Sequence, residues 1–256
     1  MTQARRVLAL MPHPDDIEIL CAGTLLRLRE RGCEVHCCTM TAGDKGSATL
    51  SRDEISAIRR AEAKAAAMLL GASSCACLGF QDLEIVFDNE SRRRVAAHVR
   101  RVNPGLIITT PPVDYMADHE VTSQLVRDAA FNAAVPNYDT GDASPPSACV
   151  PHLYYSDPVG GVDLFGSPAP RGRLVDISAQ IVAKSEVLAC HASQREWLRQ
   201  QHGMDDYIDS MRRWCAVRGA TIGVAYAENM RQHVGHPYPG SDLLAEWLGD
   251  TGQQGD

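Results

Sequence analysis

The sequence has no long hydrophobic run and no long basic run. An apolar stretch over residues 7–11 follows two arginines but ends at Pro12, so it is too short for the apolar core of a signal peptide. Nothing elsewhere approaches the length of a membrane span. The longest basic run is three arginines at 92–94, and the net charge is −7. This balance argues against nucleic acid or an anionic membrane as the main partner.

Several sequence motifs are also missing. The nine cysteines are an odd number without any C-x-x-C spacing, which argues against a disulfide framework and against a thiolate zinc site. The first strand is not followed by G-x-G-x-x-G, and G-x-S-x-G does not occur, so neither dinucleotide binding nor serine hydrolysis is indicated. We expect a cytoplasmic protein in which five cysteines are reduced core residues: Cys21, Cys37, Cys38, Cys75 and Cys77.

Short apolar segments alternate with helical patterns through the first half of the chain. The expected strands there are 6–11, 34–41, 75–79 and 106–110, and the expected helices are 20–31, 51–70 and 92–102. Strands separated by single helices imply βαβ units and a parallel sheet. The second half predicts strands at 153–157 and 174–177, helices at 179–191 and 195–218, a surface loop at 137–151 and a mixed segment at 224–239. We therefore predict an α/β fold with a mostly parallel sheet and helices on both faces.

The most informative motif, His13-Pro14-Asp15-Asp16, stands where the first strand ends. His13 and Asp16 are three residues apart across a tight turn, so their side chains can converge on one cation. Asp15 would then point elsewhere and be free to hold a proton. Two ligands with a separate base are the minimum set for activating a metal-bound water. In the alternative reading, Asp16 is only a helix N-cap and His13 is exposed.

A second histidine stands beside a carboxylate at another strand end. Asp118 and His119 follow the expected strand 106–110, and the carboxyl ends of parallel strands border one crevice. His13, Asp16 and His119 would form a site of two histidines and one carboxylate with room for water, which is typical of catalytic sites and suits zinc or iron(II). Asp118 would orient a ligand imidazole. Alternatively, Asp118 is an N-cap and His119 an ordinary first-turn residue.

These motifs resemble those of one known family, the LmbE-like or PIG-L zinc-dependent de-N-acetylases. The likeness spans most of residues 6–194 and rests on the blocks 11–16 and 41–46, Arg59 with Glu62, Asp118-His119, and 191–194. The resemblance implies a Rossmann-like sheet, zinc bound by His13, Asp16 and His119, Asp15 as general base, and Arg59 as a substrate-binding residue. It also implies a trimer or hexamer. We expect one domain, with a C-terminal helical elaboration at 195–248 and a loose tail at 249–256.

One position departs from the family pattern. Family members often carry a histidine three residues before the second ligand histidine, where this chain has Met116, which cannot donate a hydrogen bond. His236 lies in a loop bounded by glycine and proline, and we expect it to supply the missing catalytic donor, in its own chain or in a neighbouring subunit. The alternative for His236 is a surface or packing role.

The expected activity is hydrolysis. A metal-activated water, with Asp15 as general base, would remove an N-acetyl group from an amino-sugar-containing small molecule, the usual class of substrate that the resemblance implies. Two alternatives use the same scaffold: an amidase that acts on a thiol conjugate, and a hydratase that adds water to an unsaturated acid. Release of free acetate from an N-acetyl sugar separates deacetylation from both.

Overall fold

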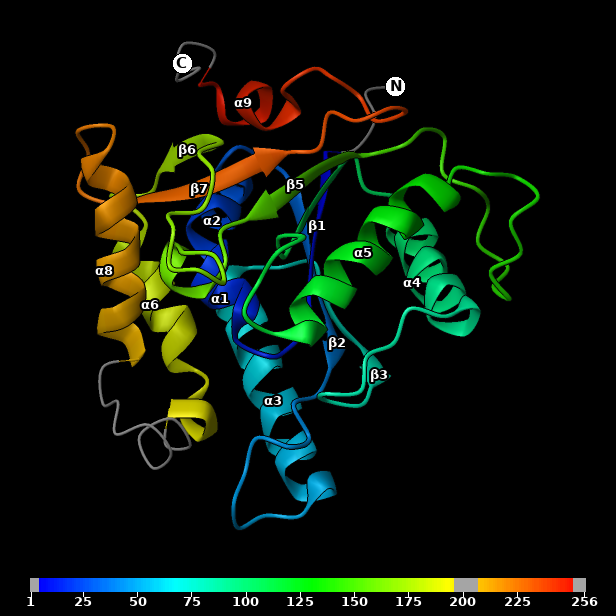
Figure 1. The fold of residues 1–256 in the computed structure, drawn as a ribbon, viewed down its shortest axis with the longest axis horizontal. Coiled ribbons are helices and arrows are strands. Elements are labelled where there is room, and N and C mark those ends of the chain that lie inside the picture. Colours follow the sequence, from blue (N-terminus) through cyan, green and yellow to red (C-terminus); the bar gives the residue numbers. More distant parts are fainter. Residues whose placement is uncertain (1–4, 196–206, 251–256) are drawn as a thin grey trace.

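The computed structural model describes residues 5–195 and 207–250. Within these residues, seven strands form one sheet in the order β3-β2-β1-β4-β5-β7-β6. The strands are β1 (Arg6–Met11), β2 (Glu34–Thr41), β3 (Ser74–Phe80), β4 (Leu106–Thr109), β5 (His152–Ser156), β6 (Arg173–Asp176) and β7 (Ala227–Gln232). Strands β1 to β5 are parallel, whereas β7 is antiparallel to both of its neighbours. The predicted α/β fold with a mostly parallel sheet is confirmed (Figure 1).

Helices cover both faces of the sheet. One core lies between the sheet and α1 (Asp16–Leu20), α2 (Ala22–Glu30), α3 (Arg52–Leu70), α6 (Ile181–Ala189), α8 (Tyr207–Ala220) and α9 (Leu243–Leu248). The other lies under α4 (Asn89–Val102) and α5 (Ala117–Asn132). Strand β1 shows why both faces must be covered, because its alternate side chains enter opposite cores: Val7 and Ala9 belong to the first core, and Leu8 and Leu10 to the second.

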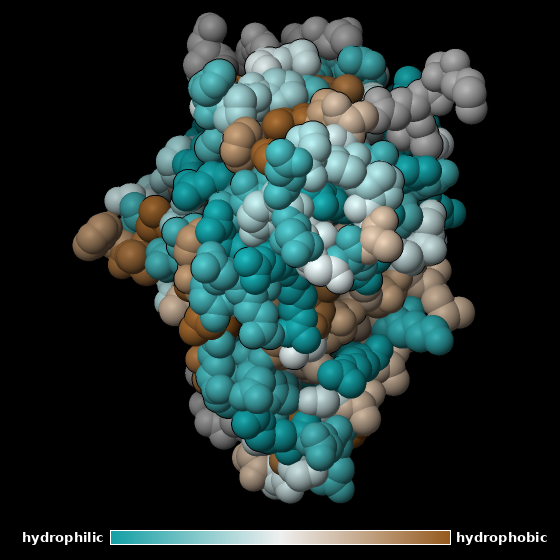
Figure 2. Space-filling model, turned by 90° about the vertical axis from the view of Figure 1, so that its right-hand side faces the viewer, coloured by the Kyte–Doolittle hydropathy of each residue, from teal (hydrophilic) through white to brown (hydrophobic). Residues whose placement is uncertain are grey.

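The outer surface of the layer formed by α4 and α5 is polar. Figure 2 shows this side of the molecule, with α4 and α5 toward the viewer, as largely hydrophilic. No helix among the described residues is long and apolar enough to span a membrane.

Local sequence signals explain the helix ends. Ser51 caps α3 by accepting a hydrogen bond from the Glu54 amide, and the Glu54 side chain accepts from the Ser51 amide in return, which is a capping box. Gly71 ends α3 with a φ of 78°, a conformation that glycine adopts without strain. The helix expected at 20–31 begins earlier, at Asp16, and Cys21 divides it into α1 and α2 with a φ of −146°.

Four expectations need correction or fall outside the described residues. The mixed segment at 224–239 contains β7, which completes the sheet between β5 and β6. Cys75 is exposed and Cys77 only half-buried, because β3 is an edge strand. Of the helix expected at 195–218, residues 196–206 lie outside the described residues, as does most of the expected tail, 251–256.

The connections place a crevice between β1 and β4. Helices α1 and α2 follow β1 onto one face of the sheet, whereas α5 follows β4 onto the other. The chain therefore diverges to opposite faces at the carboxyl ends of two adjacent strands. Such switch points are where open α/β sheets bind ligands.

Candidate metal centre and catalytic site

The three predicted metal ligands meet at this switch point. His13 and Asp16 lie in the turn after β1, and His119 lies in the first turn of α5 after β4. His13 Nδ1 is 3.3 Å from Asp16 Oδ2, and His119 Nε2 is 3.6 Å from Asp16 Oδ1. One ligand atom from each residue lies within 4.8 Å of the others, and all three residues are buried.

This geometry fits a divalent cation. Zinc bonds of 2.0–2.1 Å at tetrahedral angles place neighbouring ligand atoms about 3.4 Å apart, close to the two measured separations. The local charge also favours a cation, because five buried aspartates lie in this region, at positions 15, 16, 82, 114 and 118. Two histidines and one carboxylate could serve as the ligand set, with the other carboxylates around it.

Each ligand histidine is oriented by an aspartate on its second nitrogen. His13 Nε2 lies 3.1 Å from Asp118 Oδ2 and 3.0 Å from Asp82 Oδ1, and His119 Nδ1 lies 3.1 Å from Asp114 Oδ2. Such partners fix the ring and its tautomer, as metal-binding histidines require. Asp118 thus orients the distant His13 rather than its neighbour His119. These contacts leave His13 Nδ1 and His119 Nε2 directed toward Asp16.

Asp15 stands apart from the ligands in a strained turn. Its φ is 98°, which is rare outside glycine and is a feature that clusters at functional sites. Its side chain does not cap α1. Instead, Oδ2 accepts a hydrogen bond from the Tyr207 hydroxyl, and Oδ1 is 3.6 Å from Arg59 Nη2. The alternative of an ordinary N-cap turn at Asp16 therefore does not describe this segment, and His13 is buried rather than exposed.

The two adjacent aspartates have opposite electrostatic environments. Burial raises the pKa of Asp15 above its ordinary value, although Arg59 and the Tyr207 hydrogen bond act against the shift. Burial acts in the same direction on Asp16, but His119 and His13 outweigh it and lower the pKa of that carboxyl. Neighbouring carboxyls whose pKa values are pushed apart are typical of separate base and ligand roles.

Arg59 is buried beneath the turn. Its Nη2 donates to the Pro14 carbonyl at 2.7 Å, and its Nη1 donates to the Gly43 carbonyl at 3.4 Å. Glycine is required at 43, where φ is 65° and an added Cβ would lie 2.1 Å from Arg59 Nη1. The guanidinium thus joins the two loops after β1 and β2, and its Nε has no hydrogen-bond partner.

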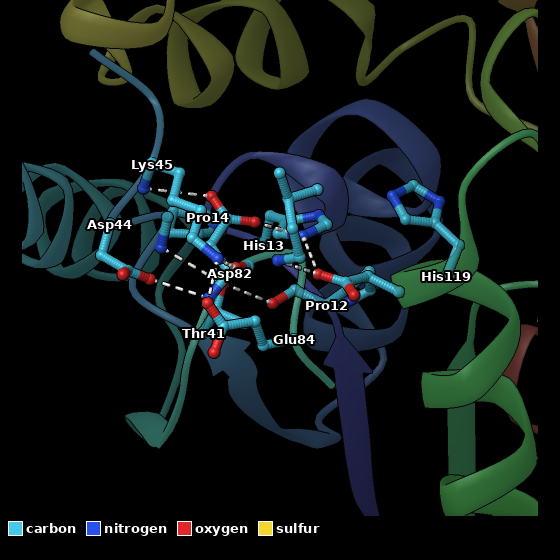
Figure 3. A network of polar contacts seen from close by, with 12 residues as sticks. Pro12, His13, Pro14, Thr41, Asp44, Lys45, Asp82, Glu84 and His119 are labelled. Carbon is cyan, nitrogen blue, oxygen red and sulfur yellow. Dashed lines mark hydrogen bonds and ion pairs between the residues drawn. The ribbon is translucent and has the colours of Figure 1, made fainter. Parts of the chain in front are cut away.

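A second polar network fixes the loops beside His13. The Asp44 carboxylate accepts from the Asp82 amide at 2.8 Å, and Lys45 Nζ donates to the Asp82 carbonyl and to Glu84, both at 2.5 Å. Figure 3 shows His13 between this network and His119. The loops after β1, β2, β3 and β4 are therefore held together around the metal ligands.

These loops open into a cavity of about 610 Å³. The reacting groups line one part of it: His13, Asp15, Asp16, Arg59 and His119. Helix α8 contributes Tyr207, Ser210 and Trp214 to the wall, and Met116 also lines the cavity. Met116, the position at which the chain departs from the family pattern, therefore lies at the site itself. Its thioether cannot donate a hydrogen bond there.

His236 is not brought to this cavity within the chain. It is exposed, in the loop after β7. Gln232 pairs with Tyr154, and the His233 amide donates to the Leu153 carbonyl, so this loop continues toward the amino end of β5. The metal ligands lie at the carboxyl ends of the strands, which is the opposite edge of the sheet.

Sequence reasoning did not identify several residues of the site. Tyr207 lies 192 positions from Asp15 and carried no motif. Asp82 follows β3 at the same sheet edge, so its position after a strand was the one available signal. His191, from the 191–194 block, is buried with its Nε2 3.3 Å from Glu18 Oε2, and Ser193 of that block donates to Glu62 of α3.

Comparisons with known proteins identify similar sequences and structures. Residues 8–130 match the family model PIG-L, described as GlcNAc-PI de-N-acetylase. Diacetylchitobiose deacetylase of Thermococcus kodakarensis is 28% identical over 195 residues, which cover 74% of this chain and 70% of that protein. A probable N-acetyl-alpha-D-glucosaminyl L-malate deacetylase 2 of Bacillus anthracis is 32% identical over 137 residues, which cover 50% of this chain and 61% of that protein.

The fold is shared with a solved deacetylase. The structure of N,N'-diacetylchitobiose deacetylase from Pyrococcus horikoshii superposes with a TM-score of 0.78 at 26% identity, covering 94% of this chain and 89% of the other. The family match contains all three proposed metal ligands, Asp15 and Arg59. Residues 8–130 of this chain therefore form a PIG-L (LmbE-like) family domain.

Proposed function

We propose that the protein is a metal-dependent hydrolase that removes the N-acetyl group from an amino-sugar-containing small molecule. One observation carries the proposal: the His13–Asp16–His119 group and a separate buried Asp15 border one cavity. The domain is related to proteins named as deacetylases of N-acetylated sugars, which supports this substrate class. Two histidines and one carboxylate suit zinc, and iron(II) as well.

Different residues of the site take different roles in amide hydrolysis. When bound, the metal supplies Lewis-acid polarisation of the amide carbonyl and a lower pKa for water. Asp15 accepts the proton of the water that attacks the carbonyl carbon, and later returns it to the departing amine nitrogen. Water and amide are thereby converted to acetate and a free amine. Asp118 and Asp114 hold the two ligand rings in place.

Arg59 and Tyr207 position the base from two sides. Arg59 fixes the turn through the Pro14 carbonyl, and Tyr207 donates to Asp15. Burial raises the pKa of the Tyr207 hydroxyl well above its ordinary value, so this group stays a neutral donor at the pH of the reaction. Tyr207 therefore contacts the base as a neutral hydrogen-bond donor, alongside the cationic Arg59.

The test is product identification. Wild-type protein loaded with zinc is incubated with N-acetylglucosamine, diacetylchitobiose and N-acetylglucosaminides, and acetate is measured by an enzymatic assay and mass spectrometry. We expect loss of one acetyl group from at least one compound, and no loss with Asp15→Asn. Asp209→Asn, a change at an exposed residue of α8, is the matched control. Absence of acetate release across the panel would contradict the proposal.

The alternatives give different products. A hydratase would consume an unsaturated acid without releasing acetate, and an amidase of thiol conjugates would require the thiol portion of its substrate.

The nine free cysteines fit a reducing compartment and support a cytoplasmic location. Elemental analysis of protein purified from cells under anaerobic conditions separates zinc from iron.

A further inference from the structure

Leu83 has an unusual conformation at the edge of the cavity. Its φ is 61°, in the left-handed region that favours glycine and asparagine. Its side chain is 59% exposed, so hydrophobic burial in the fold does not offset the strain. Strained residues of this kind persist where the surroundings impose them, and they cluster at ligand sites.

The surroundings do impose this conformation. The Leu83 amide donates to Asp118 Oδ2 at 2.7 Å, and the same oxygen lies 3.1 Å from His13 Nε2. The adjacent residues Asp82 and Glu84 are held by Lys45. The leucine is therefore fixed relative to the metal ligand His13, on a turn that has little freedom to move.

Leu83 continues an apolar wall on the cavity. The apolar wall consists of Ile19, Leu83, Tyr115, Met116, Val159 and Trp214. Tyr115 is 64% exposed, and its ring lies 5.3 Å from that of His119. Tyr115 thus lies beside a proposed metal ligand, and both Tyr115 and Leu83 are exposed to solvent. The cavity of about 610 Å³ is in the range that holds whole small-molecule ligands.

We propose that the apolar wall, with Leu83 as its specificity-determining residue, binds an apolar group of the substrate next to the reacting amide. This inference rests on the proposed function and narrows it, from N-acetylated amino sugars in general to amphiphilic ones. The apolar group is either an aglycone on the sugar or an acyl chain longer than acetyl. Both sources offer the same chemistry to the wall, and the experiment distinguishes them.

The experiment uses two substrate series with the zinc-loaded protein. One series is methyl, butyl and hexyl N-acetylglucosaminides of both anomers, and the other is glucosamine carrying acetyl, butanoyl or hexanoyl groups. We measure kcat/KM for carboxylate release and, independently, the Kd of the same compounds by calorimetry. Burial of a methylene corresponds to about a three- to fourfold gain, so we expect kcat/KM to rise on the order of tenfold or more along one series.

The variant Leu83→Asn separates a specificity role from a structural one. Asparagine tolerates the left-handed conformation, so we expect a melting temperature equal to or above that of the wild type. The preference for the hexyl over the methyl compound should nevertheless fall by on the order of tenfold. Val86→Asn is the matched control, because Val86 is 53% exposed on the same loop but does not line the cavity; its preference should equal that of the wild type.

The outcomes separate this inference from the proposed function. Tighter binding of hexyl compounds that Leu83→Asn abolishes, without acetate release, would support the apolar subsite while contradicting deacetylation. Equal kcat/KM and equal Kd along both series would overturn the subsite while leaving deacetylation intact. An unchanged preference in Leu83→Asn would likewise overturn the role of Leu83.

Discussion

Asp15 and Asp16 are neighbours in the chain but have different partners. Asp16 lies against the two ligand histidines, whereas Asp15 contacts Tyr207 and Arg59. We predict that Asp15→Asn keeps the metal and lowers kcat by on the order of 10²–10⁴, the range for loss of a general base. Asp16→Asn should lose metal instead. Elemental analysis after gel filtration distinguishes the two variants, and equal metal loss in both would contradict the division of roles.

Tyr207 offers a second test at the level of single side chains. We expect Tyr207→Phe to lower kcat by about tenfold or more with KM little changed, because the lost contact is to the base and acts in the transition state. Metal content should be unchanged. Tyr138→Phe removes a hydroxyl from a half-buried tyrosine outside the cavity lining and is the control. A larger effect on KM than on kcat would instead indicate a substrate-binding role.

The sequence predicted that the proposed ligands would lie close together, but it did not predict which residues orient them. His13 and His119 were predictable because each follows a strand, and adjacent parallel strands end at one edge. That Asp118 would contact His13, and Asp114 the ring of His119, depends on the angle at which α5 leaves β4. The position of Tyr207 depends on the packing of α8 against α6 and β7, which no local pattern encodes.

Helices and strands were predictable where the local sequence alone shows which of their residues are buried. Each strand from β1 to β4 is a short apolar run, and α3 carries its own cap signals. Strand β7 reads Ala-Glu-Asn-Met-Arg-Gln and has no apolar alternation. Its polar residues are satisfied by distant partners: Glu228 accepts from the Gly23 and Thr24 amides and from Lys184. A strand that is stabilised by such distant contacts cannot be predicted from its own sequence.

Helix α4 contains a group that should make stability depend on pH. Burial, followed by Arg101 and His36, lowers the pKa of His98 to about 4, and its Nε2 has no hydrogen-bond partner. Below pH ~6.5 the unfolded chain gains a proton that folded His98 takes up only near pH 4. The unfolding free energy should therefore fall as the pH drops through this window, by on the order of 3 kcal/mol from this group.

Urea unfolding at pH 7 and pH 4.5, with chelator present, measures this dependence. His98→Gln removes the titrating ring, so the variant should lose less stability than the wild type over the same interval. Equal losses in the two proteins would contradict the prediction for His98.

At the scale of the molecule, the metal centre joins preformed parts. The proposed ligands come from the segments that follow β1 and β4, at the starts of α1 and α5. Neither hydrophobic core of the sheet includes them. We therefore expect chelation to abolish activity while far-ultraviolet circular dichroism stays unchanged. Returning zinc should raise the melting temperature, because a ligand that binds only the folded state stabilises it and relieves repulsion among the buried aspartates. Loss of secondary structure on chelation would contradict this view, as would full metal occupancy in purified His119→Ala.

His236 tests the expected assembly. Because it lies at the edge of the sheet opposite the metal ligands, it can reach a site only across a subunit interface. We predict a trimer or hexamer by light scattering, and a decrease in kcat of about tenfold for His236→Ala with metal content intact. An active monomer, or an unchanged kcat in the variant, would contradict this prediction.

The residues proposed for catalysis and those proposed for substrate specificity come from different parts of the chain. Asp15 and the proposed metal ligands lie in the segments that follow β1 and β4, and Gly43, in the loop after β2, cannot accept even a methyl group beside Arg59. The apolar wall, by contrast, takes Leu83 from the turn after β3, Val159 from η1 (Val159–Gly161) and Trp214 from α8, and these side chains are half-buried or exposed. Substitutions in the apolar wall should therefore change which substrates bind while leaving the proposed catalytic groups in place.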